Sequence, residues 1–288
     1  MQRLKYINPR GVEIDFTSAA PFVFWKIDGL SLPEAIIINT QAAGQNGFSA
    51  HSVVMEERYI KLTGHIHGKT GVAEMYALRQ KMSSALNPSL GPGVIVYEND
   101  YGKWKIDAIC TSAPYLDKVR NIQTLNVNFT CPSPYFLSSE PLIILLSYVE
   151  GGLEFPVVTP GYFGTLGYLA EVDNDSNDDL PIEMLMEGGA VNPVITNKTT
   201  GEFIKLTKDI PVGEKLYVNT NPEELEVSLI YIDPSTNKEK RINAYGYLTA
   251  DSTLLKMKPG TNELTFTSDD ETKKVKIKIT IYKRYAGV

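Results

Sequence analysis

Residues that build catalytic and metal centres are scarce in this sequence. Its 288 residues include three histidines and two cysteines, and two cysteines make neither a metal cluster nor a disulfide framework. The glycine patterns that bind phosphates or dinucleotides are absent, as is the Gly-x-Ser-x-Gly sequence of many hydrolases. Because no clustered set of acids, bases or ligands is visible, we predict that the protein is not an enzyme and uses no cofactor and no metal.

The two cysteines are expected to pack in the core and not to take part in a reaction or bind a metal. Cys110 and Cys131 both fall in strand-like runs, so we expect two buried, reduced thiols. A single bridge between them stays open if their strands pair, although a reducing cytosol disfavours it.

Long apolar runs and an excess of positive charge are also missing. The apolar run Pro141–Val149 is far too short to span a bilayer, and the first residues lack the apolar core of a signal peptide. A net charge of −6 and an isoelectric point near 5.3 argue against a dedicated nucleic-acid binder. We therefore expect synthesis in a cytosol and no membrane partner. Residues 1–140 carry +1 and residues 141–288 carry −7, which indicates two surfaces with different roles.

Alternating apolar and polar residues dominate the first half of the chain, and this period is that of half-buried strands. Segments 3–8 and 11–16 flank a turn with Pro and Gly and predict an opening hairpin. Helical spacing of apolar residues occurs over 71–88, and Asn87-Pro88 ends that helix. Further strands are predicted at 22–30, 35–39, 58–68, 93–99, 102–112 and 122–131.

A stiff segment, CPSPY (Cys131–Tyr135), separates this pattern from a different one. Its prolines fix the backbone and prevent the preceding strand from continuing, as expected at a domain junction. Beyond Phe136, short strands alternate with Gly, Pro, Asn and Asp at regular spacing, which predicts an antiparallel sandwich or jelly roll. We therefore predict a mainly β protein with two domains: residues 1–137, a β-sandwich or barrel-like domain with one helix, and residues 138–288, an all-β sandwich.

Two polar patterns were weighed as metal sites. His65 and His67 share one strand face, but a third ligand is not evident nearby unless His51 or Glu57 folds back. The acidic segment Asp173–Asp179 matches the first ligands of a calcium loop and then fails at the positions that require Gly and Glu. We interpret the histidines as half-exposed strand residues and the acidic segment as a solvated loop.

Tyrosine is abundant, with 16 copies. Tyr217, Tyr231, Tyr245 and Tyr247 lie in the predicted sandwich. Exposed aromatic rings on a concave sandwich face bind sugars, although strand tyrosines more often pack in a core. Tyr245 and Tyr247 are our candidate sugar or partner contacts.

Several motifs together resemble the siphophage tail-component family, whose best-known members are the distal tail proteins. A helix ending in ALNP precedes the strand pair GVIVYEN and GKWKIDAI and then NFTCPSPYF. NPVITNKTTGEFIKL, PVGEKLYVNT and LKMKPGTNELTF follow in the family's order, and the resemblance extends from Asn8 to Val288. The segment Asp173–Asp179 and the crossover before it are not part of that pattern.

The resemblance implies a structural role at the tail tip of a phage virion or of a phage-tail-like particle, after synthesis in the cytoplasm of a bacterial host. It implies a homohexamer whose N-terminal domains form a ring, with galectin-like or carbohydrate-module-like C-terminal sandwiches outside it. The implied partners are the tail tube protein, the tail-tip hub or tail-associated lysin, and receptor-binding or baseplate proteins. DNA would pass the lumen without specific binding, which the net charge permits.

The segment Thr40–Ser52 is the candidate contact between subunits. It is rich in Gly, Ala and Gln, has no hydrophobic period and reads as a surface loop that becomes ordered on a neighbour. The residues assigned to this contact are Thr40, Gln41, Gln45, Asn46 and Phe48. The alternative function is a carbohydrate-binding module for adsorption to the host surface; a hydrolase is disfavoured because no catalytic set is visible.

Overall fold

A computed structural model describes residues 2–147, 168–176, 178–270 and 275–288. Within these residues the chain is mainly β with one α-helix, as predicted. Its contacts divide it into two compact units: unit 1 is Met1–Ser139 with Arg284–Val288, and unit 2 is Glu140–Lys283. The boundary expected from the sequence lies between residues 137 and 138. The contact division additionally assigns the C-terminal residues to unit 1.

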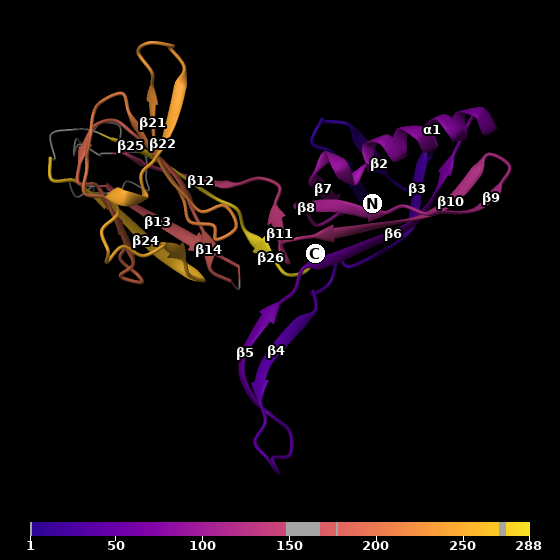
Figure 1. Ribbon diagram of the computed structural model, residues 1–288, viewed down its shortest axis with the longest axis horizontal. Coiled ribbons are helices and arrows are strands. Elements are labelled where there is room, and N and C mark those ends of the chain that lie inside the picture. Colours follow the sequence, from indigo (N-terminus) through magenta and orange to yellow (C-terminus); the bar gives the residue numbers. More distant parts are fainter. Residues whose placement is uncertain (1, 148–167, 177, 271–274) are drawn as a thin grey trace, which may run out of the picture. The chain divides into compact units, whose positions relative to one another are not determined.

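Unit 1 is built around one large antiparallel sheet (Figure 1). Its main strand order is β2-β1-β7-β8-β10-β6-β3. A bridge between Thr17 and Val23 joins the two edge strands, so the sheet closes on itself like a barrel. The strands of unit 1 are β1 (Arg3–Ile7), β2 (Glu13–Phe16), β3 (Phe22–Asp28), β4 (Ala35–Thr40), β5 (Ser49–Met55), β6 (Arg58–His67), β7 (Gly93–Glu98), β8 (Lys103–Ser112), β9 (Tyr115–Val119), β10 (Ile122–Cys131), β11 (Phe136–Ser138) and β26 (Arg284–Tyr285).

The core of unit 1 follows from the alternation in its strands. Every second residue of β1, β7 and β10 is buried, and the rings of Tyr6 and Phe129 lie 5.2 Å apart inside the sheet. Helix α1 (Val72–Ala85) adds Met75 and Met82 to this core. It ends at Leu86, ahead of the 3-10 helix η1 (Pro88–Leu90), so the predicted stop is confirmed.

Gln123 is one residue whose burial the hydrophobic pattern did not predict. In β10 the buried side chains alternate as Gln123, Leu125 and Val127, so a polar residue that is 3% exposed stands in the apolar row, while Ile122 lies on the other face. The amide of Gln123 donates to the carbonyls of Leu116 and Asp117 at 2.8 and 3.2 Å. A buried amide is tolerated when its hydrogen bonds are made.

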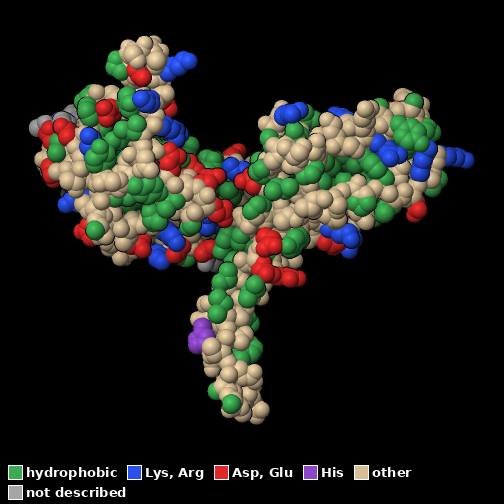
Figure 2. All heavy atoms as spheres, in the orientation of Figure 1, with side chains coloured by type: hydrophobic (Ala, Val, Ile, Leu, Met, Phe, Trp, Pro, Cys, Tyr) green, Lys and Arg blue, Asp and Glu red, His purple; other side chains and the backbone are tan. Residues whose placement is uncertain are grey.

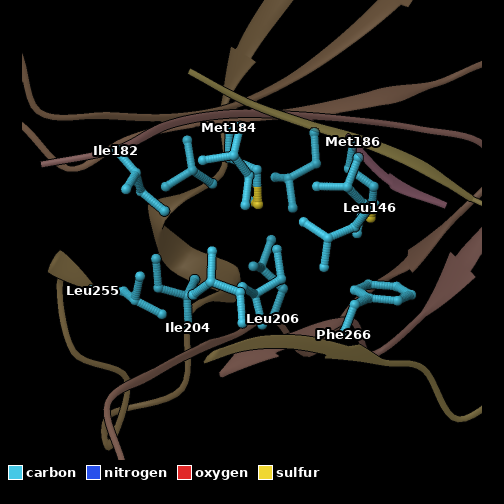
Figure 3. Close-up of a cluster of buried hydrophobic side chains, with 14 of the residues drawn as sticks. Leu146, Ile182, Met184, Met186, Ile204, Leu206, Leu255 and Phe266 are labelled. Atoms are coloured by element: carbon cyan, nitrogen blue, oxygen red, sulfur yellow. The ribbon is translucent and has the colours of Figure 1, made fainter. Parts of the chain in front are cut away.

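Unit 2 is a sandwich of two antiparallel sheets, ordered β12-β25-β15-β20-β21-β22 and β13-β24-β17-β18. Side chains of both sheets meet in one apolar core, where Met184 and Met186 face Ile204, Leu206 and Phe266 (Figure 3). This core agrees with the predicted sandwich. The strands are β12 (Leu142–Ser147), β13 (Tyr168–Asn174), β14 (Leu180–Pro181), β15 (Glu183–Glu187), β16 (Ala190–Val191), β17 (Val194–Asn197), β18 (Phe203–Lys205), β19 (Asp209–Ile210), β20 (Lys215–Asn219), β21 (Glu226–Ile232), β22 (Glu239–Asn243), β23 (Lys256–Met257), β24 (Gly260–Thr267) and β25 (Lys276–Ile281).

The PGTN turn at the start of β24 is fixed by Asn262, which is fully buried. Its Nδ2 donates to the carbonyls of Lys258 and Gly260 at 2.7 and 2.9 Å. Its Oδ1 accepts from the backbone N–H of Lys258 and from the amide of Asn197 at 3.0 and 2.9 Å. Gly260 has a φ of +91°, a conformation that favours glycine. One amide therefore closes the turn and links it to β17.

We expect Asn262→Ala to lower the free energy of unfolding by about 2–4 kcal/mol, because several buried partners lose their hydrogen bonds. Urea unfolding followed by circular dichroism measures this change. The control is Glu263→Ala at the next position, which removes a surface ion pair with Lys198 and should cost less than about 1 kcal/mol. Equal losses in both variants would contradict the assignment.

The acidic segment Asp173–Asp179 is held by lysines where it is described. Asp175 pairs with Lys283 at 2.8 Å and Asp179 with Lys258 at 2.7 Å. Asn177 lies outside the described residues, as does most of the crossover before the segment. Within the described part of the chain, no group of three or more His, Cys, Asp or Glu residues is arranged to hold a metal ion.

Candidate interaction surfaces

The most exposed element of unit 1 is a hairpin formed by β4 and β5, here called the arm (Ala35–Met55). Figure 1 shows it projecting away from the rest of the unit, and its two strands form a separate two-stranded sheet. All six residues of β4 are exposed, and so are the residues of β5 except Met55. The arm therefore contributes almost nothing to the core of unit 1.

The arm carries aliphatic side chains on both faces. Ile36, Ile38 and Val54 lie on one face and are 51, 50 and 52% exposed, while Ile37 and Val53 lie on the other. Figure 2 shows hydrophobic side chains along its length. A lone two-stranded hairpin is marginally stable in water, and contiguous exposed apolar surface marks an interaction site. This element has the properties of a contact that a partner completes.

The predicted contact residues lie at the tip of the arm. Thr40 ends β4 and its Oγ1 lies 2.8 Å from Nε2 of His51. Gln45 closes the tip, because its side chain accepts from the N–H of Ala42 and its carbonyl accepts from the amide of Gln41, both at 3.0 Å. Asn46 and Phe48 are exposed beside it.

The predicted loop, Thr40–Ser52, is longer than the observed one at both ends. Only residues 41–48 lie between the strands, since β4 includes Thr40 and β5 begins at Ser49. The composition of Ala50, His51 and Ser52 is that of a loop, which hid the strand from sequence reasoning. Pairing with β4 makes this segment extended, with Ser52 opposite Ile38 and Ala50 opposite Asn39. Sequence reasoning also missed the exposure of Ile36–Ile38, because a run of three isoleucines is typical of a buried strand.

The base of the arm is tied to unit 1 by Arg58, which is 1% exposed. Its guanidinium donates to the carbonyl of Pro134 at 3.0 and 2.8 Å and to that of Gly29 at 2.6 Å. It also donates to the carbonyls of Ser31 and Ala286. Burial lowers the pKa of Arg58. One cation thus joins the chain entering the arm, the CPSPY segment and the C-terminal residues.

The two cysteines are free and buried, as predicted. Burial raises the pKa of Cys110 to about 11 and that of Cys131 to about 12. Both thiols therefore stay protonated at neutral pH, and a protonated thiol is a poor nucleophile.

The raised thiol pKa values predict very slow labelling of the native protein. At pH 8 the thiolate fraction of a group with a pKa near 11 is more than about 100-fold below that of an ordinary cysteine, and burial slows access further. We expect no measurable reaction with a chromogenic disulfide reagent until urea is added, when two thiols per chain react. Fast labelling of one thiol in the folded protein would contradict the buried assignment.

His65 and His67 are half-buried on one face of β6, with ring centroids 6.4 Å apart. The pKa of His65 is lowered mainly by burial and, to a smaller extent, by the charge of the neighbouring His67. The two residues considered as third ligands make other hydrogen bonds. His51 is hydrogen-bonded to Thr40 within the arm, and Glu57 accepts a hydrogen bond from the hydroxyl of Tyr59.

The structure places Tyr245 and Tyr247 in the 3-10 helix η2 (Tyr245–Tyr247) and not on a concave sheet face. Tyr245 packs against the core of unit 2. Tyr247 is 37% exposed, and the ammonium of Lys208 lies 4.9 Å from the centre of its ring.

The outer face of the six-stranded sheet carries a hollow of about 260 Å³, lined among others by Tyr217, Lys278 and Arg241. The guanidinium of Arg241 lies 5.1 Å over the ring of Tyr217 and covers it. Burial is the main cause that raises the pKa of Tyr217. The hollow is therefore walled by charged groups, and its tyrosine ring is already covered by a cation.

The described residues thus form a closed β domain with an exposed arm and a β-sandwich. Residues 10–131 match the phage tail protein RIFT-related domain, and residues 176–285 match the C-terminal domain of the siphovirus-type tail component. The chain belongs to the family of siphophage distal tail proteins. It is a structural protein of a phage tail.

Solved structures show the same fold. The Dit protein (gp 19.1) of phage SPP1, described as a paradigm of the hub adsorption apparatus in phages that infect Gram-positive bacteria, is 11% identical. That likeness covers 99% of both chains with a TM-score of 0.67. A chain of the phage P2 baseplate in its activated conformation with Ca is also 11% identical, over 100% of this chain and 99% of that chain, with a TM-score of 0.58. No curated protein sequence matches. In the part of the chain that the structure describes, no helix has the length and hydrophobicity to cross a bilayer.

Proposed function

We propose that this tail protein assembles as a homohexameric ring that joins the tail tube protein to the hub at the tail tip. The ring would also be the platform for receptor-binding or baseplate proteins, and DNA would pass its lumen without specific binding. The subunits would be made in the cytoplasm of the bacterial host. The observation that carries the proposal is the arm, an exposed apolar hairpin whose strands, apart from the half-buried Met55, bury no residue against the rest of unit 1.

A ring requires two different, complementary faces on every subunit, related by a rotation that closes. The arm supplies one such face because it extends aliphatic side chains beyond the barrel of unit 1. Its buried anchor, Arg58, fixes the chain at its base. An arm fixed at its base loses less conformational freedom when it binds a neighbour, which favours association.

The mass of the purified protein tests this proposal. Mass photometry and sedimentation should show a species of six times the 32.0 kDa chain, and electron micrographs should show six-fold rings. A protein that stays monomeric at high concentration, and that does not associate with tail tubes, would contradict the proposal.

Limited proteolysis tests whether the arm is the contact. Every tip residue from 41 to 48 except Gln45 is exposed in the single chain, so a protease should cut there in monomers and fail to cut in rings. Equal cleavage in both species would place the contact elsewhere.

Saccharide binding by unit 2 during adsorption is a second candidate, favoured by the exposure of Tyr247. A glycan array probed with the full chain and with Tyr247→Ala tests it. Binding that is lost in the variant would support the candidate, and the absence of any saccharide binding would remove it.

A further inference from the structure

A second surface of unit 1 combines cations with tyrosine rings, where helix α1 lies against β9. Arg79 of the helix lies 4.1 Å over the ring of Tyr115 and 5.4 Å over that of Tyr76. Lys118 of β9 donates to the hydroxyl of Tyr76 at 2.7 Å. Arg120 follows in the turn after β9, with a φ of +51°. We call Tyr76, Arg79, Lys118 and Arg120, with the exposed β9 residues Leu116 and Val119, the α1–β9 patch.

Hydrogen bonds beneath the patch fix α1 to β9 and β9 to β10. The hydroxyl of Tyr115 donates to the carbonyl of Arg79 at 3.0 Å and lies 2.7 Å from Oγ of Ser83. The amide of Gln123 binds the carbonyl of Leu116 at 2.8 Å and so fixes β9 to β10. The cations are therefore positioned on a formed surface and do not hang from a flexible loop.

The cations of the patch lack carboxylate partners. Within the described residues, neither Arg79, Lys118 and Arg120 nor the nearby lysines 69 and 81 take part in an ion pair. Of the two neighbouring acids, Glu74 is bound to the N–H of Thr70 at 2.6 Å, and Asp117 is exposed on β9. Figure 2 shows Lys and Arg side chains gathered at the end of unit 1 where β9 lies. The patch is thus a net positive surface with unused capacity for anions.

The same surface is partly apolar. Val119 is 67% exposed, Leu116 48% and Tyr76 47%. β9 pairs with β10 along one edge, and the structure pairs no described strand with its other edge. Cations beside exposed aliphatic side chains and a strand edge fit a protein surface. A phosphate backbone uses the cations alone.

We propose that the α1–β9 patch binds acidic side chains of a second copy of this chain. Charge complementarity supports this occupant: the residues of unit 1 include 14 Lys and Arg and 11 Asp and Glu, whereas residues 140–283 include 14 and 23. Unit 2 of a second copy therefore offers an excess of carboxylates that complements the positive charge of the patch. The inference rests on the proposed ring, to which it adds a contact distinct from the arm.

Carbodiimide cross-linking of the full chain tests the proposal, because this reagent joins lysine amines only to carboxylates in direct contact. Rings are assembled from equal amounts of ¹⁴N- and ¹⁵N-labelled protein, and mixed-isotope peptides identify links between copies. We expect such links from Lys118, or from Lys69 or Lys81, to Asp or Glu residues of another copy.

Charge reversal supplies the second measurement. Lys118→Glu/Arg120→Glu should remove these links and raise the dissociation constant of the assembly at least tenfold at low salt. The matched control is Lys61→Glu/Lys103→Glu, which reverses two exposed lysines of the same unit outside the patch. Thermal unfolding of monomers confirms that both variants are folded.

The outcomes separate the two proposals. Intact wild-type rings without cross-links between copies at these lysines overturn the patch contact and leave the ring standing. Duplex DNA or a different acidic tail protein that binds the wild type and not the reversed variant, with ring mass unchanged, also overturns it. A protein that never self-associates overturns both.

Discussion

Replacing Ile36, Ile38 and Val54 with serine should convert the proposed ring into monomers. These side chains form one face of the arm and are each about half exposed in the single chain. Burying an aliphatic side chain of this size contributes about 1.5–3 kcal/mol. A half-exposed side chain gains about half of this, so we expect the three substitutions together to cost roughly 3 kcal/mol at each subunit interface, which lowers the association constant at least 100-fold. Mass photometry across a dilution series measures the loss.

The control for the arm is a substitution on a different exposed site. Tyr101 lies in the turn between β7 and β8 and is 91% exposed, so Tyr101→Ser should leave the assembly intact. Thermal unfolding of the triple variant should match the wild-type monomer, because the arm makes no core contact. Rings that persist in the triple variant would exclude this face, and Ile37→Ser/Val53→Ser would then test the opposite one.

Arg58→Met should lower the free energy of unfolding of unit 1 by about 3–5 kcal/mol, because four buried or partly buried carbonyls lose their donor together. Arg58→Lys should recover little of this loss, since a single ammonium cannot reach carbonyls from Gly29, Pro134 and Ala286 at once. Urea unfolding followed by tryptophan fluorescence measures the change, because both tryptophans, Trp25 and Trp104, lie in unit 1.

The control for Arg58 lies on the same strand. Lys61 of β6 points outward and is exposed, so Lys61→Met should change stability by less than about 0.5 kcal/mol. A loss below 1 kcal/mol for Arg58→Met would show that water replaces the guanidinium at these carbonyls. It would also remove Arg58 as the anchor of the arm.

Local periodicity was sufficient to predict most strands and the single helix, since burial in β1, β7 and β10 follows the alternation of their residues. Arg58 could not be found this way. Its acceptors lie at positions 29, 31, 134 and 286, and only the folded backbone brings them together. An arginine between Glu57 and Tyr59 otherwise looks like a surface residue.

The exposed aliphatic side chains of the arm and the positions of the tyrosine rings could not be predicted, for a related reason. Sequence patterns report how apolar a segment is, but not whether its apolar faces find a partner within the chain. The strand predicted at residues 35–39 is confirmed as β4, but the exposure of Ile36–Ile38 could not be read from the sequence. Tyr245 and Tyr247 could be assigned to the sandwich but not to the 3-10 helix that fixes where their rings point.

The chain leaves unit 1 after β11 and returns to it at β26, and these strands are antiparallel neighbours with Leu137 opposite Arg284. Paired residues of this kind lie about 5 Å apart, so a turn of a few residues would reconnect the barrel if residues 140–283 were cut out. In topological terms the sandwich is an insertion in a hairpin loop. A domain inserted at such a site can be exchanged as a whole, so a different C-terminal domain could replace the sandwich without any change in the core of unit 1.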